Sequence, residues 1–210
     1  MEKFRKKFKI LKNGFTLAEV LITLVIVGVV AAMTISVLIN NIEKKHLIIG
    51  WRKSFSDVSR ALLLAKANND TFIGVSGDNM PQIISKYINS KPCVGTYKAQ
   101  TPSYTDFNRD TNCLELENGV RLVFAGSGAY RGTQVNFDIN NSRKPNALGK
   151  DIFCATLDKN EYKLYPGKGY QNGWGCSDGV IYTLDGGTVC NANDPWNSYA
   201  CSAYYLLKDK

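Results

Sequence analysis

Three residues near the N-terminus have types and spacing that suit proteolysis and charge pairing: Gly14, Phe15 and Glu19. The glycine ends a short basic segment, and the acid follows at the head of an almost uncharged apolar run. If the chain is cut between Gly14 and Phe15, the new α-amino group lies one helical turn from Glu19 and becomes a candidate counter-ion. A charge inside a membrane costs roughly 3 kcal/mol or more, so Glu19 needs a partner.

The apolar run from Phe15 to Ile39 is long enough to cross a bilayer. As a helix, its 25 residues would extend about 37 Å, against a hydrocarbon core of about 30 Å. Lysine and arginine collect on the cytoplasmic side of membrane helices, so the basic segment keeps the N-terminus inside. We therefore expect a single-pass protein of the inner, cytoplasmic membrane with an exported C-terminal domain.

The stretch Gly14-Phe15-Thr16-Leu17-Ala18-Glu19 resembles the class III signal of type IV prepilins and type II secretion pseudopilins, G-F-T-L-x-E. The resemblance implies cleavage after Gly14 by a prepilin peptidase and methylation of the Phe15 amine. It also implies assembly with like subunits or other pilins, on an inner-membrane platform, into a periplasmic or cell-surface filament. Phe15, Thr16, Leu17 and Glu19 would form the assembly segment, in which Glu19 pairs with the terminal amine of a neighbouring subunit.

Two other interpretations apply to residues 12–39. An ordinary secretory signal has an apolar region of about 7 to 15 residues before a small-x-small site, whereas this run is longer and Val30-Ala31-Ala32-Met33 matches poorly. A plain membrane anchor leaves Glu19 unexplained. The alternative function is an uncleaved, membrane-anchored extracytoplasmic binding domain, for example for envelope polysaccharide.

The formal net charge of +8 is concentrated in the first 14 residues, which carry six Lys or Arg and one Glu and leave +3 for the remainder. The excess of basic residues therefore mainly sets the orientation of the membrane helix and indicates no specific nucleic-acid partner. A DNA-uptake pseudopilin, another role within the family, would predict a basic outer face. The only histidine, His46, lies on the expected helix, so a nucleophile relay is unsupported and we expect no enzyme.

All six cysteines follow the membrane run, on the expected oxidising side, where disulfides form. The absence of a C-x-x-C pair disfavours a zinc site. Six cysteines allow fifteen pairings, and the sequence does not choose among them. Our working expectation is sequential pairing, and the resemblance to pilins implies that the last pair closes a loop near the C-terminus: Cys93 with Cys113, Cys154 with Cys176, and Cys190 with Cys201.

Apolar residues continue at spacings of three, four and seven after Ile39, and Asn68-Asn69-Asp70 is the first clear stop, so one helix is expected over residues 15–69. The rest predicts hairpins around Asn118-Gly119, residues 158–160 and residues 185–187, a strand over 133–139 and a short helix over 80–87. The fold class is α+β, a long N-terminal helix packed on an antiparallel sheet. We divide the chain into a cleaved leader (1–14), a membrane and assembly half (15–39), an amphipathic half (40–70) and an exported domain with disulfides (71–210).

The loop from residue 138 to 151 alternates oxygen donors that could hold Ca²⁺: Asp138, Asn140, Ser142 and Asp151. Some pseudopilins hold calcium in a similar loop. The alternative is a turn in which Asn and Asp bond their own backbone, and the basic neighbours at 143 and 144 favour it. Residues 194–199 loosely resemble a D-P-W-G-x-P-Y stretch of major pseudopilins and indicate a disulfide-closed surface loop.

Overall fold

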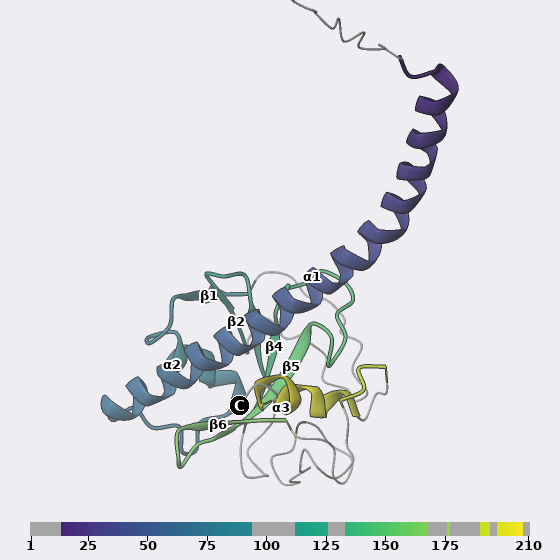
Figure 1. The fold of residues 1–210 in the computed structure, drawn as a ribbon. Helices are drawn as coiled ribbons and strands as arrows, with labels where there is room; N and C mark the ends of the chain where they lie inside the picture. The colour runs from purple at the N-terminus through teal and green to yellow at the C-terminus, as the bar shows by residue number, and fades with distance from the viewer. Residues whose placement is uncertain are drawn as a thin grey trace, which may run out of the picture. The chain divides into compact units, whose positions relative to one another are not determined.

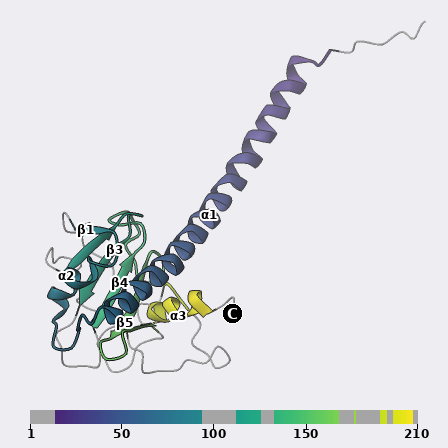
Figure 2. The same cartoon turned by 90° about the vertical axis from the view of Figure 1, so that its left-hand side faces the viewer.

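A computed structural model of the chain describes residues 14–93, 112–125, 133–167, 176, 190–193 and 197–207. The chain divides into two compact units, Met1–Glu43 and Lys44–Lys210, which are considered separately. Helix α1 (Leu17–Ala67) contributes residues to both units. Figures 1 and 2 together label the helices and strands along the chain.

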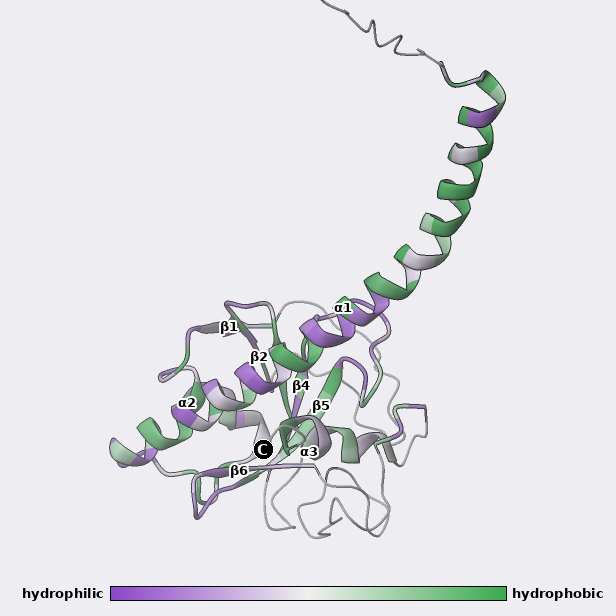
Figure 3. Cartoon of the chain, in the orientation of Figure 1, coloured by the Kyte–Doolittle hydropathy of each residue, from purple (hydrophilic) through white to green (hydrophobic). Residues whose placement is uncertain are grey.

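The first unit consists, where the structure describes it, of the start of α1 and the three residues before it. Every described side chain here is exposed except that of Ala31, which is half-buried. Figure 3 shows the helix apolar on all sides over most of this length. A helix without a polar face buries its surface in lipid or against other apolar helices.

In the second unit, α1 is amphipathic and ends as its sequence predicts. Asn69 adopts a left-handed backbone with φ of 59°. The Asp70 N–H donates to the Ala65 carbonyl over 3.1 Å, and the Asn69 N–H donates to the Lys66 carbonyl over 3.1 Å. These two bonds form a Schellman motif, in which asparagine is an accepted left-handed residue. The expected stop at residues 68–70 is confirmed.

The second unit contains one antiparallel sheet in which each strand pairs with the next along the chain. The predicted α+β class is confirmed, as are the hairpins around residues 118–119 and 158–160. The remaining helices are α2 (Met80–Ile84) and α3 (Ala200–Leu207), with 3₁₀ turns at Gly77–Asn79 and Asn197–Tyr199. The strands are β1 (Ser90–Pro92), β2 (Cys113–Leu116), β3 (Arg121–Ala125), β4 (Thr133–Asp138), β5 (Ile152–Asp158) and β6 (Lys163–Pro166).

One face of the sheet packs against α1, and α3 lies beside this part of α1 in both views (Figures 1 and 2). Trp51 is fully buried there, with its ring 5.2 Å from that of Phe153 and 4.8 Å from that of Phe137. Aromatic pairs at these distances add about 1 kcal/mol each beyond their buried area. Trp51 therefore packs directly on the sheet through two aromatic pairs.

The opposite face of the sheet has a different character. Register pairs place Cys113, Val123, Asn136 and Cys154 in one row across β2 to β5. All four are buried. Two half-cystines thus occupy the face that does not pack against α1.

Two elements of the second unit were not anticipated, β1 and α3. The expected surface loop at the C-terminal end is wrong for residues 198 and 199, because Ser198 is 2% and Tyr199 1% exposed. The buried residues continue into α3, where Cys201 and Ser202 are both fully buried. The hairpin expected around residues 185–187 lies outside the described residues.

Candidate functional site

The first turn of α1 places Thr16 and Glu19 in direct contact. The Thr16 N–H and the Thr16 hydroxyl each donate to Glu19 Oε2 over 2.8 Å, and the Glu19 N–H donates to Thr16 Oγ1 over 3.2 Å. With Leu17 as the first helical residue, Thr16 is the N-cap and Glu19 the third residue of the helix. This reciprocal arrangement is a capping box, which satisfies two backbone donors that the helix start would otherwise leave open.

The capping box was missed by our sequence reasoning, which weighed Glu19 only as a charge in a membrane. The signal is present as Thr16-Leu17-Ala18-Glu19, a T-x-x-E pattern before an apolar run. Glu19 thus has hydrogen-bond partners within its own chain. Its carboxylate also lies at the positive end of the helix dipole, which favours a negative charge.

Gly14 and Phe15 precede the helix and are exposed, Phe15 by 88%. A Cβ built at Gly14 would meet no atom within 4 Å. Packing in this chain therefore does not require a glycine at this position. A requirement for glycine would have to come from a molecule that recognises the bond between Gly14 and Phe15.

The polar side chains within the apolar run form hydrogen bonds to their own helix. The Thr23 hydroxyl donates to the Val20 carbonyl over 2.9 Å, and the Ser36 hydroxyl donates to the Ala32 carbonyl over 3.2 Å. The Thr34 hydroxyl donates to the Val30 carbonyl over 2.9 Å. Such bonds remove hydroxyl donors from an environment without water. By length and composition, α1 can cross a membrane.

The calcium expectation concerned four residues, which the structure places in two environments. Asp138, at the end of β4, and Asp151, before β5, are fully buried, whereas Ser142 is exposed and Asn140 half-buried. Burial, together with repulsion from Asp151, raises the pKa of Asp138 to about 8. Burial also raises the pKa of Asp151. Two buried carboxyls that disfavour simultaneous ionisation therefore lie under the loop.

The carboxylate of Asp151 and the side-chain oxygen of Asn141 already accept hydrogen bonds from the backbone of this loop. Asp151 accepts from the Asn146 N–H over 2.8 Å and from the Ala147 N–H over 2.7 Å. The Ser142 N–H donates to the side-chain oxygen of Asn141 over 2.8 Å. Within the described ranges, no three His, Cys, Asp or Glu residues are grouped to hold a metal. These bonds fit the turn interpretation, and calcium binding stays a prediction.

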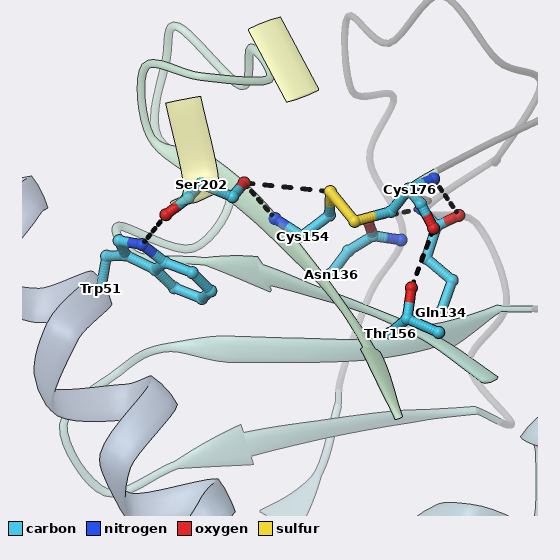
Figure 4. Close-up of a disulfide and its surroundings, with 7 residues drawn as sticks. All are labelled: Trp51, Gln134, Asn136, Cys154, Thr156, Cys176 and Ser202. Carbon is cyan, nitrogen blue, oxygen red and sulfur yellow. Dashed lines mark hydrogen bonds between the residues drawn. A yellow bond between two sulfur atoms is a disulfide. The ribbon is translucent and has the colours of Figure 1, made fainter. Parts of the chain in front are cut away.

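Three disulfides cross-link the second unit: Cys93–Cys113, Cys154–Cys176 and Cys190–Cys201. These are the pairs that sequential pairing names. At the Cys154–Cys176 disulfide, polar side chains of the sheet form hydrogen bonds with the backbone of Cys176 (Figure 4). Gln134 Oε1 accepts the Cys176 N–H over 3.1 Å, and the Thr156 hydroxyl donates to the Cys176 carbonyl over 2.9 Å.

Ser202 joins this disulfide to α1. Its carbonyl accepts the Trp51 Nε1–H over 3.0 Å, and its hydroxyl oxygen accepts the Cys154 N–H over 2.9 Å (Figure 4). Gly167 lies against the same bridge, since a Cβ there would overlap both sulfur atoms. The second unit therefore has a connected set of contacts that runs from α1 through α3 to β5.

Comparison with known proteins finds a match to a family model over a short N-terminal segment. The model described as "Prokaryotic N-terminal methylation motif" matches residues 11–35, which include Gly14, Phe15 and Glu19. No curated protein and no solved structure gives a significant match. The matched segment contains the bond after Gly14, the capping box and most of the apolar run, so the chain carries the N-terminal signal of type IV pilins and pseudopilins.

Proposed function

We propose that this chain is a prepilin-like structural subunit that is cut after Gly14, N-methylated on Phe15 and assembled through its apolar helix into a type IV pilus or a type II secretion pseudopilus. The observation that carries the proposal is the combination of the methylation motif with an apolar run, residues 15–39, that has no buried side chain. A large exposed aliphatic surface is costly in water, and neighbouring helices or lipid can cover this one.

 The segment therefore needs a cover, which lipid supplies before assembly and other subunits supply after it.

Glu19 has a specific part in this proposal. In the single chain its carboxylate accepts two hydrogen bonds from Thr16, which keep it satisfied at the helix start. On assembly, the terminal amine of a neighbouring subunit would add a positive charge to the same carboxylate. Because a paired charge is favoured over an unpaired one inside a membrane, this contact would fix the position of one subunit against the next.

The proposed partners follow from the same steps. A prepilin peptidase and methylase would act at the cytoplasmic face of the inner membrane, and an assembly platform there would move subunits from lipid into the filament. The exported unit would face outward on a periplasmic or cell-surface filament. Its three disulfides suit an oxidising compartment.

Mass spectrometry of the intact protein and its N-terminal peptide, recovered from the native membrane, tests the proposal. We expect a chain that begins at N-methylated Phe15. A chain that retains residues 1–14 in cells with an active prepilin peptidase would overturn the proposal and favour the anchored binding domain. Shearing the cells and probing the released filaments then separates a surface pilus from a periplasmic pseudopilus.

A further inference from the structure

The exported half of α1 carries the positive charge of the trimmed chain. Residues 44–67 hold six Lys or Arg and one acid, whereas residues 68–210 hold fourteen of each kind. Residues 15–43 contain two acids, Glu19 and Glu43, and no base. The excess is therefore confined to one stretch of 24 residues in a single helix.

Part of this charge lies on one outward row of α1, which we call the basic stripe: Lys45, Ile49, Lys53, Ser56, Arg60 and Leu63. The steps of three and four residues place all six on the same side of the helix. All six are exposed. The residues of α1 that pack into the exported unit, among them Trp51 and Val58, are different ones. The domain thus leaves the stripe available.

The composition of the basic stripe differs from that of a simply solvated face. Ile49 is 62% and Leu63 61% exposed, and they alternate with the charged residues. Asp57 is the single acid on this half of the helix, and the described part of the chain shows no ion pair between it and Lys53 or Arg60. Apolar and charged residues at helical spacing are typical of a seam between two helices.

We propose that the basic stripe packs against an acidic amphipathic helix of a different subunit in the same filament. The inference rests on the proposed function. Two copies that packed stripe against stripe would bring like charges together, and these repel across the spacing of about 8–10 Å between packed helices. A partner with excess Asp and Glu would offset the charge and exclude self-packing. This chain would then stand beside another kind of subunit instead of forming a filament alone.

A photo-crosslinking residue at Ser56 tests the partner in the full chain, in its native membrane. We expect an adduct with a second protein that has the same type of N-terminal signal and excess acid on the corresponding helical stretch. Reversing two charges of the stripe, with Lys53→Glu and Arg60→Glu together, should lower the adduct yield by about tenfold or more.

The matched control reverses one Arg and one Lys elsewhere, with Arg143→Glu and Lys144→Glu, both of which are exposed. This control should keep the adduct yield within about twofold, and both double variants should unfold at the wild-type temperature. An adduct with a second copy, with lipid or with nucleic acid, an equal loss in the control, or no adduct would overturn the inference. N-terminal mass spectrometry on the same material separates the two proposals, since a retained leader overturns the proposed function, whereas a mature chain with a self-adduct overturns only this inference.

Discussion

Residues 17–43 and 44–67 of α1 form one unbroken helix, yet the two halves obtain their stability from different sources. The second half buries Trp51, Val58 and Leu62 completely. The first half has no buried residue, and its hydroxyl groups bond to its own backbone. One helix can therefore be stabilised over part of its length by packing within its own domain and over the rest by its surroundings.

The largest expected effect comes from Glu19→Ala in the first half. Removal of the carboxylate should leave cleavage intact but reduce recovery in sheared filaments by about tenfold or more, because the charge pair between subunits is lost. Glu43→Ala is the matched control, since it removes the other acid of this half, and should assemble normally. Immunoblots of filament and membrane fractions measure both. Normal assembly of Glu19→Ala would contradict the assigned role.

Trp51→Ala is the corresponding test in the second half. The loss of three aromatic neighbours and of the bond to Ser202 should lower the free energy of unfolding by about 3–5 kcal/mol. Ile26→Ala in the first half should leave unfolding of the second unit, residues 44–210, unchanged. Chemical denaturation followed by near-ultraviolet circular dichroism compares the two. Equal effects of the two substitutions on the free energy of unfolding would contradict the difference between the two halves of α1.

Replacing Cys154 and Cys176 together with serine tests the opposite face of the sheet. Opening this bridge, with a sequence separation of 22 residues, should destabilise the second unit by about 3 kcal/mol. Gln134 and Thr156 would still bond the backbone at residue 176, so the sheet should persist. Thermal unfolding, with the wild type under reducing conditions as a second reference, gives the magnitude. An unchanged unfolding temperature would count against a structural role.

The stability of the second unit should also depend on pH through Asp138. Its pKa is raised to about 8 in the folded state, against an unfolded value near 4, so the folded protein holds more protons between these limits. Stability should therefore fall as the pH rises from about 4 to about 8. Asp138→Asn should flatten this slope and gain on the order of 2 kcal/mol at pH 8. Denaturation midpoints at pH 5 and pH 8 suffice, and parallel profiles would refute the assignment.

The smallest effect is expected for Thr16→Val, which removes the hydroxyl of the capping box. Fraying should increase amide exchange in the first turn of α1 by about fivefold, as the loss of a cap costs about 1 kcal/mol. Thr16→Ser keeps the hydroxyl and should behave as wild type. Hydrogen exchange in detergent micelles, read by mass spectrometry, compares them. Equal exchange in all three proteins would show that Glu19 is held by other contacts.

The sequence was most informative where signals are local. The end of α1 follows from Asn68-Asn69-Asp70, and the hairpin at Asn118-Gly119 follows from a glycine that adopts a φ of 82°. In the second hairpin, Asp158 accepts the N–H groups of Asn160 and Glu161. Each of these choices is decided within five residues, so single-sequence reasoning can reach it.

The features that were missed depend on distant contacts. Strand β1 is three residues long and includes a proline at the edge of the sheet, so it lacks the usual strand pattern. Helix α3 is almost entirely apolar. Its place in the fold depends on the hydrogen bond between Ser202 and Trp51, which are 151 residues apart. The coupling of Asp138 to Asp151 likewise needs the β4–β5 pairing, which brings together residues 13 positions apart.

The contacts of Gln134 and Thr156 with the backbone of Cys176 bear on how the right disulfide is chosen among fifteen possible pairings. These two side chains belong to neighbouring strands and come together only when β4 and β5 have paired. The cradle that holds Cys176 next to Cys154 therefore exists only on a formed sheet. Oxidation would then follow assembly of the strands, and the sheet would act as the template that selects its own cross-link.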